Sequence, residues 1–339
     1  MSPHPYRLGF AVKVLGAGGL KSSDTRRWQN EPHLSHSLEL LDGVLGYLEA
    51  ADIRMYRMSS GTIPYGTHPD LPQFDYRRQI EACASELARL GERARALDVR
   101  LSTHPGQYTV INAPDPELQR KSSLDLEQDA LLLDSLGLGR EAVVVVHVGG
   151  AYGDKAAALD RWALAFERLS ERARARLVVE NDERLFHVGD VLELHRRTGV
   201  RVVFDIHHHR LNQAPGLEAP AEALAAAYAT WPAGVRPKAH LSAPRTELRL
   251  VKRRRPGERR AREVLAPPRL DQHADYVPPW ELTALVRAAP GPLDVMVEAK
   301  AKDLAVLALR DQVARFDGEV ALAEEYGSPG VALPSAGTG

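Results

Sequence analysis

Several short apolar stretches of the sequence end in a side chain that can bind a metal ion. The clearest, at residues 200–204, is rich in β-branched residues and runs directly into Asp205 and the histidines at 207–209. Such a stretch is typical of a strand buried on both faces, where an unpaired charge is costly unless a partner or a metal compensates it. Three similar stretches end at His147, Glu180 and Glu298. We therefore predict that several strands converge on one metal centre.

The elements that must position these residues alternate regularly along the chain. The expected strands are residues 7–12, 52–58, 100–103, 143–147, 177–180, 200–205, 236–240 and 293–298. Helical spacing of apolar residues predicts helices at residues 36–50, 76–96, 117–136, 155–175, 188–198, 220–229, 279–289 and 301–326. Eight alternations predict an α/β fold, a (β/α)8 TIM barrel, whose active site lies at the carboxyl ends of the strands.

The candidate metal ligands fall at those carboxyl ends. They are His104, His147, Glu180, Asp205, His208, His240 and Glu298, with His68 and His273 in adjacent loops. Imidazole and carboxylate groups without thiolate suit Zn²⁺, Mn²⁺ or Fe²⁺, and the set is too large for one tetrahedral ion. Two or three ions are therefore expected. Such a cluster can hydrolyse a phosphodiester, and an aldose–ketose isomerase could use two metals in the same barrel.

Composition narrows the possible classes of protein and its possible locations. The 339 residues are 44% hydrophobic and 26% charged, with a formal net charge of −1, so no global field indicates a polyanionic partner. Cys83 is the only cysteine, which excludes an internal disulfide and fits a reducing cytoplasm. No apolar run is long enough to span a membrane. We expect a cytoplasmic monomer with one domain over residues 1–326 and a disordered tail at 327–339.

One segment is strongly basic despite the balanced total. Residues 243–276, between the seventh and eighth strands, contain the run Arg253, Arg254 and Arg255 among further arginines. A charge run is often only a solvated face. On the rim of a metal site, however, it is equally suited to holding phosphates.

Seven motifs in order resemble those of the UV damage endonuclease family. They lie at residues 63–69, 104–108, 147–153, 180–183, 205–208, 237–241 and 297–300, so the resemblance covers about residues 7–302. This family is similar in fold to the endonuclease IV and xylose isomerase group. The resemblance implies an enzyme that nicks double-stranded DNA immediately 5′ of cyclobutane dimers and (6-4) photoproducts, and also abasic sites, leaving a 3′ hydroxyl and a 5′ phosphate. A sugar isomerase or epimerase and a non-catalytic damage-binding protein are the alternatives.

The resemblance also implies a role for each ligand position. Glu180 would bridge two Mn²⁺ ions, or Zn²⁺ or another divalent metal. Asp205, His240 and Glu298 would complete one site, His104 and His147 a second, and His208 and His273 a third. Lys238 stands where the family has a lysine that can be carboxylated, and it joins Glu180 and His68 as a catalytic candidate. Asp271 would either add a ligand or orient His273.

The three consecutive histidines need a local change of backbone. On a regular strand Asp205, His207 and His209 would share a face, whereas the resemblance selects Asp205 and His208. The chain must therefore leave strand geometry directly after Asp205. We expect His207 and His209 to be structural or to orient their neighbours.

Lesion recognition calls for different residues. A photodimer is poorly stacked, so extruding it costs less than extruding two normal nucleotides. Gln107 and Tyr108 match the family's probing pair, with Tyr108 offering a stacking face. Phe10 stands where a relative has a tyrosine, so the resemblance implies a stacking contact with DNA without a hydroxyl group.

Overall fold

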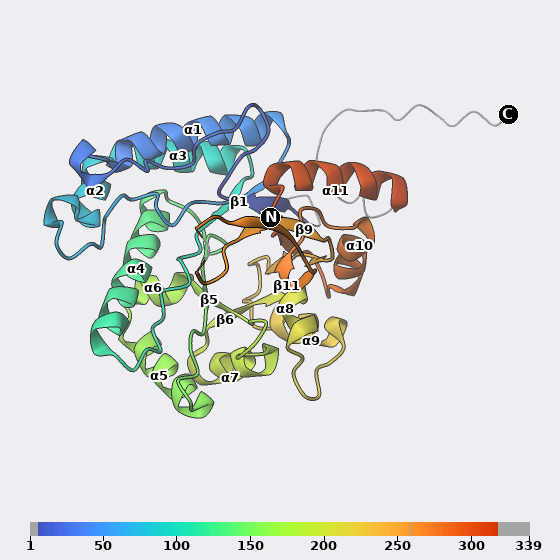
Figure 1. Ribbon diagram of the computed structural model, residues 1–339. Helices are drawn as coiled ribbons and strands as arrows, with labels where there is room; N and C mark the ends of the chain where they lie inside the picture. Colours follow the sequence, from blue (N-terminus) through green and yellow to red (C-terminus); the bar gives the residue numbers. More distant parts are fainter. Residues whose placement is uncertain (1–5, 258, 318–339) are drawn as a thin grey trace.

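Eight parallel strands form the barrel that the sequence predicts. The computed structural model describes residues 6–257 and 259–317 (Figure 1). The strand order in the sheet is β3-β2-β1-β12-β7-β6-β5-β4. A parallel bridge between Thr103 and Val144 joins the two outer strands. The strands are β1 (Leu8–Ala11), β2 (Met55–Arg57), β3 (Arg100–Ser102), β4 (Val144–His147), β5 (Leu177–Glu180), β6 (Arg201–Asp205), β7 (Lys238–Leu241) and β12 (Asp294–Val297).

Helices surround the strands, as Figure 1 shows. They are α1 (Leu34–Ala50), α2 (Tyr76–Ala82), α3 (Ala84–Ala96), α4 (Pro116–Ser135), α5 (Lys155–Arg168), α6 (Glu171–Arg176), α7 (Val188–Thr198), α8 (Ile206–Leu211), α9 (Pro220–Tyr228), α10 (Pro279–Ala288) and α11 (Lys302–Phe316). Among the residues described, no helix combines the length and the apolar character needed to cross a bilayer.

Three predicted helices differ from the structure. The helix expected at 76–96 breaks at Cys83, where the backbone leaves helical geometry. The helix expected at 155–175 ends at Arg168, and a new helix starts after Ser170, whose side chain accepts a hydrogen bond from the Ala173 N–H. The last helix ends at Phe316. The rest of its predicted span and the tail at 327–339 lie outside the described residues.

Alternation along the strands determines which side chains face the barrel interior. One set of strand residues packs within the barrel: Val143, Val145, Val178 and Val203, together with Trp231. Their neighbours in sequence, such as Val144 and Val179, belong instead to the core shared with the helices. Because side chains on a strand alternate between faces, His147, Glu180 and Asp205 share the interior face with these valines. The sequence pattern thus carries the candidate ligands into the barrel.

The basic segment between β7 and β12 contains two antiparallel strand pairs that the sequence analysis did not predict. Strand β8 (Pro244–Arg245) pairs with β11 (Arg269–His273), and β9 (Arg249–Arg253) pairs with β10 (Arg262–Ala266). These strands are drawn in orange in Figure 1. The β8–β11 pair returns the chain to the barrel, where the Ala274 N–H donates to the Ala243 carbonyl at 2.8 Å. This return places His273 near the carboxyl ends of the strands.

Candidate metal centre

Glu180 lies at the centre of the predicted ligand set. It ends β5, and its side chain is 1% exposed. Its Oε1 lies 2.8 Å from His240 Nδ1, and its Oε2 lies 3.4 Å from His104 Nε2 and 3.7 Å from His147 Nε2. One carboxylate therefore faces imidazoles from three different strand ends.

Among the described residues, two groups of three side chains have the spacing of a metal site. Their ligand atoms lie within 4.8 Å of one another in each group, and Glu180 belongs to both. The first group comprises His104, His147 and Glu180, and the second comprises Glu180, Asp205 and His240. A carboxylate common to two such groups has the position that bridging two ions requires.

The remaining predicted ligands surround the same cluster. Glu298 Oε1 lies 3.4 Å from His240 Nδ1, and Glu298 Oε2 lies 3.8 Å from His273 Nδ1. His208 Nδ1 lies 3.6 Å from Glu180 Oε1 and 3.8 Å from Asp205 Oδ2. The structure thus brings together all the side chains that the resemblance assigns to three ions.

The change of backbone expected after Asp205 is confirmed. Asp205 is the last residue of β6, and its Oδ1 accepts the His208 N–H at 2.8 Å, which caps the following helix α8. Asn181 fixes this junction, because its side chain bonds both the N–H and the carbonyl of Asp205. His208 therefore points back toward Glu180 while its Nδ1 also lies 3.0 Å from the Asn181 carbonyl.

Unpartnered atoms show how well a cation fits this cluster. Among the described residues, two buried carboxylate oxygens of the cluster have no hydrogen-bond partner, Glu180 Oε2 and Asp205 Oδ2. The ring nitrogens His147 Nδ1 and His240 Nε2 also have none, but they are not the nitrogens nearest Glu180. Buried polar atoms are rarely left without a partner, because desolvation costs free energy that nothing returns. The two carboxylate oxygens keep free lone pairs and, with the imidazoles that face them, are suitable donors for a divalent ion such as Mn²⁺ or Zn²⁺.

The pKa shifts in the cluster differ between the carboxylates. Burial raises the pKa of Glu180, but the nearby histidines His240, His147 and His104 outweigh burial and hold it well below the usual value. Burial raises the pKa of Asp205, and the carboxylates of Glu180 and Glu298 add to this shift. Burial lowers the pKa of His207, whereas the pKa of His208 is raised to about 9 because the attraction of Asp205, Glu180 and Glu298 outweighs burial. A bound cation would relieve the repulsion among the carboxylates.

His207, His209 and Asp271 have separate surroundings. His209 Nε2 lies 3.0 Å from the Glu218 carbonyl, and its ring packs on Phe204. The His207 ring packs edge-on against His273, with ring centres 5.6 Å apart. Asp271 accepts hydrogen bonds from Arg184 and Arg269, which lower its pKa to about 2. These contacts give His209 a structural setting, place His207 next to the cluster, and make Asp271 an ion-paired carboxylate.

Lys238 lies inside the barrel next to the cluster. Its side chain is 1% exposed, and its Nζ donates to Ser102 Oγ at 3.1 Å. Burial and the charges of Arg57 and Arg100 hold its pKa well below the usual value. The neutral amine is the form that reacts with carbon dioxide, so the chemistry of this site is compatible with a carboxylated lysine.

Three cationic residues were missed by the sequence analysis. Arg57 ends β2 and forms an ion pair with Glu298. Arg57, Lys300 and Lys302 line a cavity of about 410 Å³ that also contains His273 and Glu298. Arg57 could have been found from the sequence, because it ends a strand as the ligands do. It was missed because cationic side chains do not bind metal ions and were not considered. This cavity is suited to an anionic group beside the metal centre.

Five of the candidate DNA-contacting residues lie on the surface. Gln107 and Tyr108 are exposed in the loop after β3, and Tyr108 is 79% exposed. Arg253, Arg254 and Arg255 are exposed at the end of β9 and beyond it. The surface positions of these residues are those that a DNA contact requires.

Two further candidates are not placed as expected. The expected DNA contact of Phe10 is wrong for this structure, because Phe10 is 0% exposed and packs edge-on against Tyr56 in the core. His68 is exposed in the loop after β2, where its Nδ1 accepts the Asp70 N–H and its ring faces Tyr65. In the described part of the chain these contacts do not include the Glu180 cluster, so the catalytic role of His68 stays a prediction.

The fold and the cluster together define a class of protein: a parallel (β/α)8 barrel with a carboxylate–imidazole centre at the carboxyl ends of its strands. Sequence comparison is more specific, and the chain belongs to the UV-endonuclease UvdE family, whose family model matches residues 30–325. The chain is 30% identical to a UV DNA damage endonuclease of Bacillus velezensis over 295 residues, which cover 86% of this chain and 83% of that protein. It is 29% identical to one of Bacillus cereus over 289 residues, which cover 84% and 83%.

Solved structures place the family within a larger fold group. The chain is similar to the crystal structure of SacUVDE, with a TM-score of 0.74 and 27% identity over 93% of this chain and 99% of that one. Endonuclease IV of Thermus thermophilus matches with a TM-score of 0.54 and 16% identity over 91% and 99%. A D-psicose 3-epimerase matches with a TM-score of 0.53 and 11% identity over 95% and 100%. The last two likenesses show the fold alone.

Proposed function

We propose that this chain is a divalent-metal-dependent DNA repair endonuclease that nicks the phosphodiester bond immediately 5′ of a UV photoproduct. The observation that carries the proposal is the position of Glu180: it is common to two groups of ligand atoms, and its buried Oε2 has no hydrogen-bond partner among the described residues. Membership of the UV-endonuclease family supports DNA as the substrate. Cyclobutane dimers and (6-4) photoproducts are the proposed lesions, with abasic sites as a further one.

Mn²⁺ is the proposed cofactor, as two or three ions, with Zn²⁺ as the alternative. Bound there, divalent ions would polarise the phosphoryl oxygens, lower the pKa of water and stabilise the leaving oxygen. Glu180 would hold two of them, with His104 and His147 on one side and with Asp205, His240 and Glu298 on the other. His208 and His273 would hold the third.

The chain itself would bind and orient the phosphate. Arg57, Lys300 and Lys302 line the cavity next to Glu298, where a negatively charged phosphodiester would find charge-assisted hydrogen bonds. Lys238, buried nearby, is proposed to become anionic by carboxylation and thereby to supply a further ligand. Nicking with this geometry would leave a 3′ hydroxyl and a 5′ phosphate.

Recognition of the lesion is proposed to depend on distortion of the duplex. A photodimer stacks poorly, so the cost of extruding it is lower than that for two normal nucleotides. Tyr108 is exposed enough to fill the vacated space and to stack on a neighbouring base. Arg253, Arg254 and Arg255 would hold the phosphates of the flanking duplex.

The direct test is incubation of the full chain with Mn²⁺ and a duplex that carries one defined thymine dimer. We expect a single nick 5′ of the dimer, with a 3′ hydroxyl and a 5′ phosphate by end-group analysis. An undamaged duplex of the same sequence is the substrate control, and Glu180→Gln is the matched variant. Equal nicking of both duplexes, or full nicking by Glu180→Gln, would refute the proposal.

A further inference from the structure

Lys302 has a backbone conformation that a lysine rarely adopts. Its φ is +55°, in the left-handed region, although it is the first residue of α11. This region is unfavourable for a residue with a side chain, because its Cβ approaches the following carbonyl oxygen. A strained residue of this kind persists only where its surroundings hold it, and such residues are frequent at functional sites. Lys302 is therefore expected to have neighbours that hold its backbone and a role for its side chain.

The group that holds this backbone is the next residue, Asp303. Its side chain is 0% exposed and accepts three hydrogen bonds: from the Leu15 N–H at 2.7 Å, the Gly16 N–H at 2.8 Å and the Tyr47 hydroxyl at 2.7 Å. Leu15 and Gly16 belong to the loop after β1, and Tyr47 lies in α1. One buried carboxylate thus fastens the start of α11 to two other elements.

The contact between Asp303 and this loop is close. A Cβ at Gly16 would lie 2.8 Å from Asp303 Oδ2 and 2.9 Å from the Tyr47 hydroxyl oxygen, so only glycine fits there. The N–H of Lys302 itself donates to the Ala299 carbonyl at 3.2 Å. The backbone of Lys302 is therefore fixed on both sides, by its own hydrogen bond and by the side chain that follows it.

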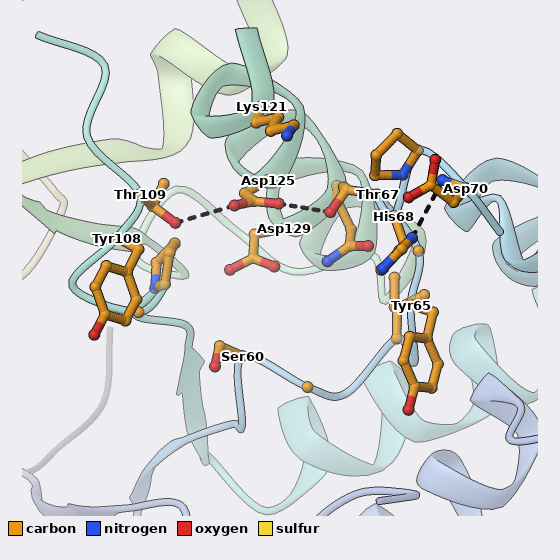
Figure 2. A pocket seen from close by; sticks show the side chains of 17 residues that line it. Ser60, Tyr65, Thr67, His68, Asp70, Tyr108, Thr109, Lys121, Asp125 and Asp129 are labelled. Carbon is orange, nitrogen blue, oxygen red and sulfur yellow. Dashed lines mark hydrogen bonds between the residues drawn. The ribbon is translucent and has the colours of Figure 1, made fainter. Parts of the chain in front are cut away.

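A second helix holds loops at the carboxyl end of the barrel in a similar way. Asp125 of α4 accepts a hydrogen bond from the Thr67 hydroxyl at 2.7 Å and another from the Thr109 hydroxyl at 3.1 Å, as the dashed lines in Figure 2 show. Thr109 follows the proposed probe residue Tyr108. In both places a carboxylate on a helix fixes the backbone next to a residue that is proposed to contact DNA.

The side chain of Lys302 lines the cavity of about 410 Å³ that also contains Glu298. Burial and nearby positive charges lower the pKa of Lys302. These charges belong to Arg57, Lys13 and Lys300, and the carboxylate of Glu298 opposes them. The excess of positive charge beside Glu298 is suited to a phosphate group.

We propose that Asp303 is a positioning residue for DNA binding: it holds Lys302 in the left-handed conformation and so keeps its ammonium in the cavity, where it binds a phosphate of the DNA strand. The inference rests on the proposed function, because it requires DNA at the metal centre. Asp303 does not line the cavity and acts through Lys302. A glycine at position 302 would relieve the strain but would not contact the phosphate.

The test measures the midpoint of urea unfolding of the full chain, and KM and kcat with Mn²⁺ and a duplex that carries one thymine dimer. Lys302→Gly should raise the midpoint, because glycine adopts the left-handed conformation without strain. It should also raise KM about tenfold with little change in kcat, since the lost contact binds the ground state and the transition state alike. A lysine with only a structural role would not combine higher stability with weaker binding.

Two variants control for charge and for strain. Lys302→Arg keeps the positive charge and should keep KM within about threefold of the wild-type value. Ala17→Gly is the control for strain, because Ala17 is also left-handed, with a φ of +50°, but is exposed and does not line the cavity. It should raise the midpoint and leave KM unchanged.

The positioning role is tested by Asp303→Asn in two backgrounds. The amide offers one acceptor oxygen in place of two, so KM should rise in the wild-type background. In the Lys302→Gly background KM should not rise further, because the contact that Asp303 supports is already lost. Should Asp303→Asn not fold, Tyr47→Phe removes one of the three hydrogen bonds to the same carboxylate and takes its place in this comparison.

Failure of this inference is distinguishable from failure of the proposed function. If the wild type nicks no dimer-containing duplex, the proposed function fails and the positioning role fails with it. If the wild type nicks the dimer but Lys302→Gly keeps the wild-type KM, only the positioning role is refuted. An equal rise of KM on Asp303→Asn in both backgrounds, or a lower urea midpoint for Lys302→Gly, would refute it as well.

Discussion

The two ends of the barrel both bury charged side chains, but they satisfy them differently. At the amino end of β12, Asp294 is 0% exposed, and both of its carboxylate oxygens are bonded: to the Arg7 N–H at 3.0 Å and its guanidinium at 2.8 Å, to Arg100 at 2.9 Å and to Arg236 at 3.2 Å. At the carboxyl end, Glu180 and Asp205 each keep a buried oxygen that has no hydrogen-bond partner in the described part of the chain.

This difference separates stability from function. Both carboxylate oxygens of Asp294 are bonded within the protein, so this carboxylate needs no further partner once the chain has folded. The network around Glu180 is incomplete, because Glu180 Oε2 and Asp205 Oδ2 have no hydrogen-bond partner among the described residues, and a bound cation would supply one. In this barrel the amino end is therefore expected to contribute to stability, and the carboxyl end to hold the chemistry.

The largest expected effect is on activity at the carboxyl end. Glu180→Gln removes the bridging carboxylate, and we expect nicking of a dimer-containing duplex to fall by about a thousandfold or more, equivalent to about 4 kcal/mol in the barrier. Stability of the metal-free protein should change by less than about 1 kcal/mol, measured by urea unfolding. A large loss of metal-free stability would instead give Glu180 the structural role assigned to Asp294.

The largest effect on stability is expected at the amino end of the barrel, at Asp294. Asp294→Ala leaves Arg7, Arg100 and Arg236 without their common partner, and we expect about 3–5 kcal/mol of destabilisation in urea unfolding. At urea concentrations below its unfolding transition, the variant should still bind Mn²⁺. A change of less than about 1 kcal/mol would show that the amino-end network does not determine stability.

A smaller effect is expected at the probe loop. Tyr108→Ala removes an exposed stacking face, which contributes about 1–3 kcal/mol per base in nucleic-acid complexes. We therefore expect a tenfold or greater loss of preference for dimer-containing over undamaged DNA, measured by competition, with unchanged Mn²⁺ binding and stability. Tyr108→Phe is the matched control and should keep most of the preference. Loss of bound metal in the alanine variant would place Tyr108 in the structure of the centre.

The smallest effect is expected at the basic strands. Replacing Arg253, Arg254 and Arg255 with alanine should weaken DNA binding equally for damaged and undamaged duplexes. The slope of log K against log salt should flatten by about 0.9 for each phosphate that the protein no longer neutralises. Binding measured over a series of salt concentrations checks this. An unchanged slope would make these arginines a solvated face only.

The barrel could be predicted from the sequence because its strands are short, apolar and regularly spaced. The two extra strand pairs were not predictable in the same way, because residues 249–253 and 262–266 mix charged and apolar side chains without regular alternation and bury little surface. The helix break at Ser170 had a signal, since serine is a common N-cap residue. The break at Cys83 has none that propensity or spacing would reveal.

The candidate site was predictable where residue type and strand position agree. The strand-end ligands meet because alternation places His147, Glu180 and Asp205 on the interior face of parallel strands. Phe10 shows the limit of resemblance alone: it shares a strand face with Leu8, and both belong to the core that packs against the helices.

The most direct test of the central claim is a calorimetric titration of Mn²⁺ into the metal-free full chain. The account predicts at least two ions bound per chain, and a loss of binding in Glu180→Gln that Asp294→Asn does not show. Failure of the wild type to bind Mn²⁺ or Zn²⁺, or equal binding by Glu180→Gln, would contradict a metal centre built around this carboxylate.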